Sequence, residues 1–310
     1  MNGMPQTPIE IIEVAPRDGL QNEKVHLDTA TKIELINRAV AAGVKRIEVA
    51  SFARPDRVPQ MADAEAVIAG LELPDDVITI GLVMNKRGAL RALETQVKEI
   101  GAICVASDSF AQRNQGQTSL ESAEVACDII RLARQEGRRA QVTIGAAFGC
   151  PFEGEVEPDH VLRLVEQLLA AGPVDIALAD TIGVAVPARV HKLVSRAHAM
   201  AGDIPIRVHL HNTRNTGLGN AWAAVEAGAT ILDASLGGIG GCPFAPNATG
   251  NIATEDLVYM LERSDVTTGV ELDRLIDASR WLSQMMAREL PAAVSRTAPF
   301  PGPGITPVPA

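Results

Sequence analysis

Eight short runs of mostly apolar residues recur along the chain, and a helix-like stretch separates each run from the next. Most of these stretches end at a glycine, as helices often do. The runs are almost continuously apolar, as strands covered by helices on both faces should be. This alternation predicts an α/β protein, a (β/α)₈ or TIM barrel, rather than an open doubly wound sheet. The predicted strands are residues 10–15, 46–51, 78–83, 102–107, 142–148, 175–180, 205–211 and 230–235, and the glycines are Gly43, Gly101, Gly137, Gly172, Gly202 and Gly228.

The length of 310 residues fits one barrel of about 250 residues with an extension. We therefore expect one catalytic domain over residues 1–310. Within it, the barrel covers about 9–251, two helices lie in 254–264 and 271–289, and a Pro-rich, irregular tail occupies 291–310.

Composition excludes several classes of function. A net charge of −10 and 3% aromatic residues argue against binding nucleic acid. No apolar run reaches the roughly 18 residues of a membrane span, and the N-terminus lacks the features of a secretory signal. The four cysteines show no Cys-x-x-Cys spacing, which argues against a zinc ribbon and a disulfide scaffold. We expect a reduced, cytoplasmic protein.

Polar side chains gather where the predicted strands end. Enzymes with this fold place their chemistry at that end of the barrel. Any one of these residues could equally form a structural ion pair or cap a helix, but a random scatter would not favour one rim. The residues are Arg17, Asp18, Glu48, Ser51, Ser107, Asp180, Thr181, His209 and His211.

His209 and His211 are two residues apart in a predicted strand, so they project to the same side. A lone strand histidine is usually a core residue, whereas two on one side favour shared binding of a metal ion. With Asp18 they offer two nitrogens and one carboxylate, a set suited to Mn²⁺, Mg²⁺, Zn²⁺ or Fe²⁺. Such an ion can act as a Lewis acid on a substrate oxygen.

A glycine-rich segment, residues 237–241, precedes Cys242. It matches neither a Walker A loop nor a clean GxGxxG pattern, so a phosphate-binding role has little support. The glycines indicate a loop that moves or approaches a ligand closely. Cys242 could then act as an acid or base, or could be a buried, inert thiol.

Several motifs together resemble hydroxymethylglutaryl-CoA lyase, a metal-dependent TIM-barrel family with an Asp-Arg-Glu constellation. The resemblance covers about residues 9–290. Its motifs are RDGLQNE (17–23), IEVASF (47–52), DTIGV (180–184), the HxH pair, GGCPFAPNATGN (240–251) and ATEDLVYML (253–261).

The resemblance implies roles for individual residues. Arg17 would stabilise the enolate of the departing acetyl-CoA, Glu48 would support Arg17, and Cys242 would donate a proton from a closing lid. His209 would contribute to catalysis as well as to metal binding. The implied ligands of Mg²⁺ or Mn²⁺ are Asp18, His209, His211 and Asn251, and the candidate substrate contacts are Arg17, Gln21, Ser51, Ser107, Asp180 and Thr181.

The implied reaction is a retro-Claisen cleavage of 3-hydroxy-3-methylglutaryl-CoA to acetyl-CoA and acetoacetate, as in leucine degradation and ketone-body formation. The protein is expected to bind an acyl-CoA and to form a homodimer or higher homo-oligomer. Exposed basic residues that could bind the CoA phosphates, or could be only solvated charge, are Arg54, Arg57, Lys86 and Arg87.

One position departs from the family pattern. Asn212 follows the HxH pair, where typical members carry an aspartate. If that carboxylate supports the metal site, its loss puts the substrate in doubt. A lyase for isohexenylglutaryl-CoA or citramalyl-CoA is therefore the nearest alternative.

Two further alternatives are more distant. Condensing enzymes of the superfamily share RDG and HxH but lack GGCPFA and usually carry another domain, for which 310 residues leave no room. A non-catalytic barrel that senses acyl-CoA would not need Cys242.

Overall fold

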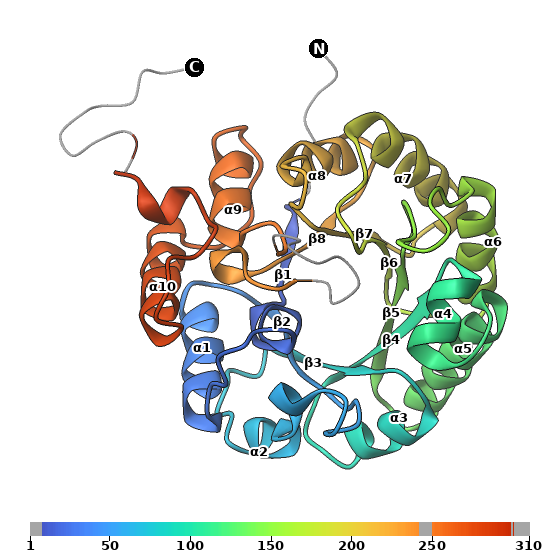
Figure 1. The fold of residues 1–310 in the computed structure, drawn as a ribbon, viewed down its shortest axis with the longest axis horizontal. Coiled ribbons are helices and arrows are strands. Elements are labelled where there is room, and N and C mark those ends of the chain that lie inside the picture. The colour runs from blue at the N-terminus through green and yellow to red at the C-terminus, as the bar shows by residue number, and fades with distance from the viewer. Residues whose placement is uncertain (1–7, 242–249, 299, 301–310) are drawn as a thin grey trace.

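The computed structural model describes residues 8–241, 250–298 and 300 (Figure 1). Eight parallel strands pair in chain order, and β1 also pairs with β8, so the sheet closes into a barrel with helices around it. The prediction of a TIM barrel is confirmed. The strands are β1 (Glu10–Glu13), β2 (Arg46–Ser51), β3 (Ile78–Val83), β4 (Glu99–Val105), β5 (Arg139–Gly145), β6 (Ile176–Asp180), β7 (Ile206–Leu210) and β8 (Ile231–Ala234).

The predicted bounds were wrong mainly at β4 and β5, which both begin three residues before the predicted ranges. Gly101 was taken as a helix end, but it lies inside β4, where a Cβ atom would meet Ile80 Cγ2 at 3.3 Å and Gln141 Nε2 at 3.4 Å. The tight space in the barrel interior accounts for this glycine. The other five predicted helix-ending glycines all have positive φ.

The helices bury one face against the strands. In α1, Leu35 and Ile36 are fully buried, and the Asp28 side chain caps the helix by accepting a hydrogen bond from Thr31 N at 2.8 Å. The helices are α1 (Thr29–Ala41), α2 (Ala64–Ala69), α3 (Lys86–Leu93), α4 (Asp108–Gln115), α5 (Ser119–Gln135), α6 (Pro158–Leu169), α7 (Pro187–Ala201), α8 (Gly217–Glu226), α9 (Thr254–Glu262) and α10 (Leu272–Met285). Over the described residues, no helix combines the length and apolarity needed to cross a membrane.

Residues 291–298, which the structure describes, begin the predicted Pro-rich tail. Residues 294–296 form a 3₁₀ turn, and Ala293 N and Val294 N donate hydrogen bonds to the Asp256 carboxylate in α9 at 2.9 and 2.7 Å. In Figure 1 this segment lies beside α9 and α10. The bonds to Asp256 join residues far apart in sequence, so the proline content alone could not reveal this turn.

The barrel interior contains a buried ionic network, which the apolar strand pattern did not predict. Arg46 in β2 contacts Glu99 in β4 and Asp175 next to β6, each at 2.5 Å. Arg207 in β7 contacts Asp175 at 2.9 Å and Asp233 in β8 at 2.6 Å. Strand β2 neighbours neither β4 nor β6, so the contacts of Arg46 run across the inside of the barrel. The network leads towards the carboxyl end of β7.

Candidate active site at the carboxyl end of the barrel

One turn of π-helix, Ala15–Gly19, follows β1 and carries Arg17 and Asp18. Gly19 N donates to Val14 O at 3.1 Å, which closes the wide turn. Gly19 permits close packing, because a Cβ atom there would meet Ile239 Cγ1 at 2.7 Å. Single π-turns are frequent at functional sites, where they redirect side chains.

Arg17 is held at both sides of its guanidinium group. Its Nε and Nη2 atoms lie 2.8 and 2.6 Å from Glu48 Oε2, and Nη1 lies 2.7 Å from Asp18 Oδ1. Gln21 Oε1 is 3.4 Å from Nη1. Burial raises the pKa of Glu48 more than Arg17 lowers it. The contacts with Glu48 and Asp18 hold the positively charged guanidinium of Arg17 in one position at the rim of the barrel.

Asp18, His209 and His211 converge. Each offers one ligand atom, and these atoms all lie within 4.8 Å of one another, so the three residues could hold a metal ion. The two imidazole rings are 5.3 Å apart between centroids, and His209 Nε2 lies 3.8 Å from Asp18 Oδ2.

Asn251 reaches the same place from the segment that follows β8. Residue 251 forms an isolated antiparallel bridge with His211, and Ile252 N donates to Leu210 O at 3.1 Å. Asn251 Nδ2 donates to Asp18 Oδ2 at 2.8 Å. At Gly240, whose φ is +107°, a Cβ atom would meet Asn251 Nδ2 at 2.7 Å, so this contact needs a glycine there.

Two unpaired polar atoms test whether this group fits a cation. His211 Nδ1 and Asn251 Oδ1 are buried, and neither has a hydrogen-bond partner among the residues that the structure describes. Buried polar atoms normally have a partner. An oxygen and a nitrogen left free beside a carboxylate fit a divalent cation with mixed nitrogen and oxygen ligands.

The electrostatics of Asp18 and His211 favour the forms that bind a cation. Burial alone would raise the pKa of Asp18, but Arg17 and both histidines outweigh it and hold the pKa well below its usual range. Burial, reinforced by His209, lowers the pKa of His211 to about 4. Asp18 is therefore charged and His211 neutral near pH 7. Burial lowers the pKa of His209, but its hydrogen bond to Asp233 reverses that and gives a net rise.

Asp233 is a site residue that the sequence interpretation missed. Its Oδ2 atom lies 3.1 Å from His209 Nδ1 and accepts a hydrogen bond from Arg207 Nη1 at 2.6 Å. The rule that paired His209 with His211 also puts Arg207 on the same side of β7, two residues earlier. A charged residue in an otherwise apolar run was the signal that could have found both.

The remaining four candidate substrate contacts make local hydrogen bonds at the ends of β2, β4 and β6. These bonds shape the loops, and contact with a substrate stays a prediction. Ser51 Oγ accepts from Ala53 N at 3.3 Å, Ser107 Oγ donates to Cys150 Sγ at 2.9 Å, Asp180 accepts from Val184 N and Ala185 N at 2.9 Å each, and Thr181 Oγ1 accepts from Ala146 N at 2.9 Å.

Asn212, where the chain departs from the family pattern, makes a local hydrogen bond. Its Oδ1 atom accepts a hydrogen bond from Gly217 N at 3.0 Å, at the start of α8. An aspartate could make the same bond. The departure at this position therefore says little about the metal ligands.

The glycine-rich segment is firmly held where it is described. Residues 236–240 are buried, and Leu236 N and Gly237 N donate to Glu13 and Glu255 at 2.9 and 3.1 Å. The expectation that this loop moves or approaches a ligand closely stays a prediction. Cys242 and residues 243–249 lie outside the described residues.

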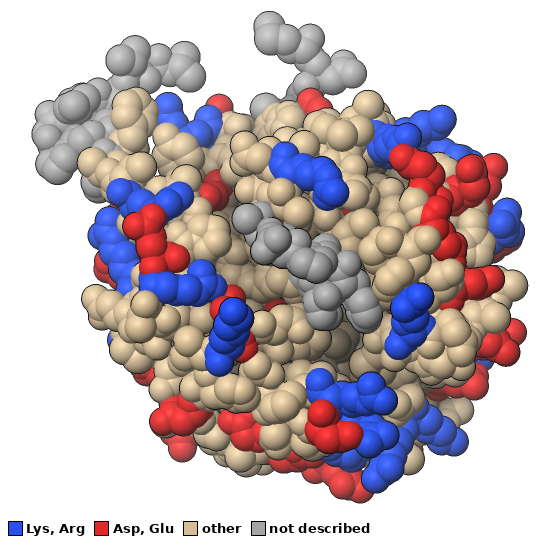
Figure 2. Space-filling view, in the orientation of Figure 1, with Lys and Arg blue, Asp and Glu red and all other residues tan. Residues whose placement is uncertain are grey.

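The four basic residues proposed for CoA are exposed, and Arg54 pairs with Asp56 at 2.6 Å. Figure 2 shows Lys and Arg side chains around the middle of the face in view.

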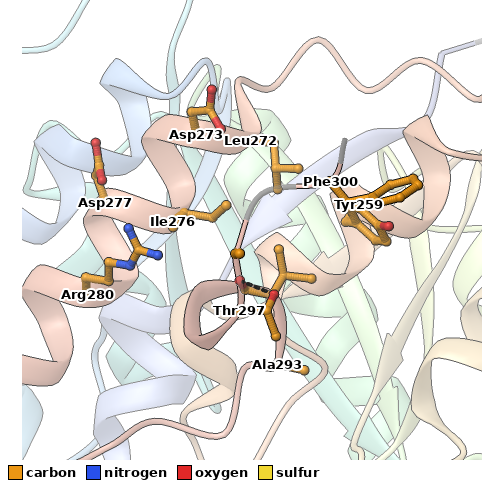
Figure 3. Close-up of a pocket in the computed structure, with 11 residues that line it drawn as sticks. Tyr259, Leu272, Asp273, Ile276, Asp277, Arg280, Ala293, Thr297 and Phe300 are labelled. Atoms are coloured by element: carbon orange, nitrogen blue, oxygen red, sulfur yellow. Dashed lines mark hydrogen bonds between the residues drawn. The ribbon is translucent and has the colours of Figure 1, made fainter. Parts of the chain in front are cut away.

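A groove of about 510 Å³ lies elsewhere, between α9, α10 and the C-terminal segment (Figure 3). Tyr259, Ile276 and Arg280 line it, and it includes none of the predicted site residues.

Comparison with known proteins gives concordant matches. A profile of the HMGL-like family matches residues 8–282. The chain is 44% identical over 301 residues to the (R)-citramalyl-CoA lyase of Chloroflexus aurantiacus, covering 94% of this chain and 95% of that protein. It is 38% identical over 284 residues to the hydroxymethylglutaryl-CoA lyase YngG of Bacillus subtilis, covering 92% and 95%.

Solved structures show the same fold. An HMG-CoA lyase from Acinetobacter baumannii, solved in complex with coenzyme A and 3-methylmalate, aligns with a TM-score of 0.91 at 39% identity. The alignment covers 97% of this chain and 98% of that one.

Proposed function

We propose that this chain, which belongs to the HMGL-like family and is a carbon–carbon lyase, cleaves the C2–C3 bond of a 3-hydroxy-3-methylacyl-CoA that carries a free carboxylate. The main support is the convergence of Asp18, His209 and His211 beside the fixed guanidinium of Arg17. Relatives named as acyl-CoA lyases, and one solved with coenzyme A, support an acyl-CoA substrate.

Asp18, His209, His211 and Asn251 would hold a divalent cation, Mg²⁺ or Mn²⁺. When bound, the cation would polarise the substrate's hydroxyl and carboxylate oxygens as a Lewis acid. The unpaired His211 Nδ1 and Asn251 Oδ1 support this assignment.

Arg17 would act on the acetyl-CoA half of the substrate. After the 3-hydroxyl loses its proton and the C2–C3 bond breaks, the bonding electrons form a thioester enolate. The contacts with Glu48 and Asp18 hold the guanidinium in one orientation, so little reorganisation is needed when that charge develops. Cys242 would then protonate the enolate carbon, a role that rests on the family resemblance.

Two substrates are the leading candidates. The GGCPFA motif and the 38% identity to YngG favour 3-hydroxy-3-methylglutaryl-CoA, with acetoacetate as the second product. The 44% identity to the Chloroflexus enzyme favours citramalyl-CoA, with pyruvate as the second product. Both would release acetyl-CoA by the same cleavage.

The test is turnover of both substrates by the metal-loaded full-length protein, with acetoacetate, pyruvate and acetyl-CoA measured separately. We expect one substrate to show a clearly higher kcat/KM. An Asp18→Asn variant should lose turnover of either one. If the wild type releases no acetyl-CoA from a panel extended to longer-branched analogues, the proposed reaction is wrong.

A further inference from the structure

We propose that Asp233 and Arg207 are positioning residues that fix the tautomer and orientation of His209, so that its Nε2 atom is presented to a divalent cation. This inference rests on the proposed metal-dependent function. It concerns two residues in the barrel wall that touch neither the substrate nor the cation.

The two ring nitrogens of His209 lie near different carboxylates. Its Nδ1 atom lies 3.1 Å from Asp233 Oδ2, and its Nε2 atom lies 3.8 Å from Asp18 Oδ2. His209 and Asp233 are register partners on the adjacent strands β7 and β8, so the backbone fixes this pairing. A carboxylate at Nδ1 favours the tautomer that carries its proton there, which leaves the Nε2 lone pair free to bind a metal.

Arg207 holds Asp233 in place. Its Nη1 atom donates to Asp233 Oδ2 at 2.6 Å, and its Nε atom donates to Asp175 Oδ1 at 2.9 Å. All three side chains are at most 3% exposed. A buried carboxylate needs a counter-charge and hydrogen bonds, and Arg207 supplies both to Asp233. Through its bond to Asp175, the Arg207 guanidinium also connects Asp233 to the rest of the buried ionic network.

The two histidines are held differently. His211 has no partner at Nδ1 within the described part of the chain, and its position depends on the backbone bridge to Asn251. A change at Asp233 should therefore act through His209 alone. The proposal can therefore be tested on the imidazole ring of His209, with His211 as the unaffected ring.

The first measurement is the tautomer of His209 in the metal-free, full-length protein, by nitrogen-15 NMR of the histidine side chains. The chain has six histidines, and a His209→Gln variant assigns the signal by its loss. We expect the wild type to carry its proton on Nδ1. We expect Asp233→Asn, whose amide can donate to Nδ1, to shift the population towards the Nε2–H form. A wild-type ring protonated on Nε2 overturns the proposal, even if the variant does not fold.

The second measurement is Mn²⁺ binding to the metal-stripped protein by calorimetry. We expect Asp233→Asn to bind about 10- to 100-fold more weakly, the loss typical of removing such a partner. The matched control is Glu99→Gln, which removes a buried carboxylate of the same ionic network that is bonded to Arg46 and Arg139 but not to Arg207 or His209. It should keep nearly wild-type affinity even if it lowers stability.

Three outcomes are decisive. Weaker binding in Asp233→Asn but not in Glu99→Gln supports the proposal. Equal loss in both variants reduces Asp233 to a structural role, and no loss in either overturns the proposal. If the wild type itself binds no Mn²⁺ while His209 carries its proton on Nδ1, the metal-dependent function fails and only the tautomer assignment stands.

Discussion

At the residue scale, the contacts of Arg17 suit it to a developing charge. Its bonds to Glu48 and Asp18 fix the plane of the guanidinium. Lysine carries the same charge but lacks the planar group with several donors. We predict that Arg17→Lys lowers kcat about 10²- to 10³-fold with little change in KM, the loss typical of one donor that acts in the transition state. Steady-state kinetics on the preferred acyl-CoA would measure this.

The control is Arg196→Lys, at an exposed arginine of α7 that also pairs with a carboxylate, that of Asp159. It should keep a near-normal kcat. If Arg17→Lys also retains normal kcat, or changes only KM, Arg17 contributes to binding rather than to the chemical step.

Cys242 gives a second prediction at this scale. Cys104, Cys127 and Cys150 are free and buried, and burial raises the pKa of Cys104 and Cys127. Buried thiols are poorly reactive, because the thiolate is the nucleophile. We predict that thiol alkylation inactivates the enzyme through Cys242 and that saturating acyl-CoA slows it. Peptide mass spectrometry would follow each cysteine, and Cys242→Ser should fold but lose most turnover. Inactivation that follows Cys150 instead would contradict this role.

Sequence could predict part of the site for a clear reason. Alternation along one strand placed His209 and His211 together, because strand geometry is local. Asn251 followed only from the resemblance, since its position depends on pairing with His211 from a distant segment. Asp233 was missed because a buried carboxylate reveals its partner only after β7 and β8 are paired.

At the element scale, two buried carboxyl groups hold the glycine-rich segment, and one of them also contacts the turn Ala15–Gly19 that carries Arg17 and Asp18. Glu13 accepts from Ala15 N at 2.7 Å, Leu236 N at 2.9 Å and the Thr254 hydroxyl at 2.7 Å. Glu255 accepts from Gly237 N at 3.1 Å. Few signals in the sequence could reveal the contacts of Glu13 with Leu236 and Thr254, because they join the first strand to segments more than 200 residues away.

This anchoring predicts a pH dependence of stability. Burial raises the pKa of Glu255 from 4.5 to about 7, and the same holds for Glu13. Between these values the folded state holds protons that the unfolded chain releases, so this contribution is full below pH 4.5 and is lost as pH rises through 7. For one group it amounts to about 3 kcal/mol at most.

We predict that Glu255→Gln, which keeps an acceptor for Gly237 N but cannot ionise, gains stability relative to wild type as pH rises from 5.5 to 8. Urea unfolding at both pH values would measure the difference. Glu166→Gln, the same change at an exposed position of α6, should show no such trend. A wild-type-like pH profile for Glu255→Gln would show that Glu255 is ionised in the folded state at both pH values.

At the scale of the whole molecule, the order of strands and helices was predictable because each element signals itself locally. The barrel interior was not. Its ionic network joins β2, β4, β6, β7 and β8, and no single segment shows that these charges meet. The sequence did not indicate that the charged residues within apolar runs contact one another. In the structure they connect the barrel interior to His209, a proposed metal ligand.

The cation should also stabilise the whole fold, because its proposed ligands come from the turn after β1, from the end of β7 and from the segment after β8. Binding to the folded state alone adds about 2.7 kcal/mol at a concentration of 100 Kd. For 310 residues, this corresponds to a rise in Tm of about 4 °C. We predict this rise for the metal-stripped protein on adding Mn²⁺, with reversal by a chelator, by scanning calorimetry. His211→Gln should fold but lose the shift, whereas His191→Gln, outside the site, should keep it. A full shift in His211→Gln would place the cation elsewhere.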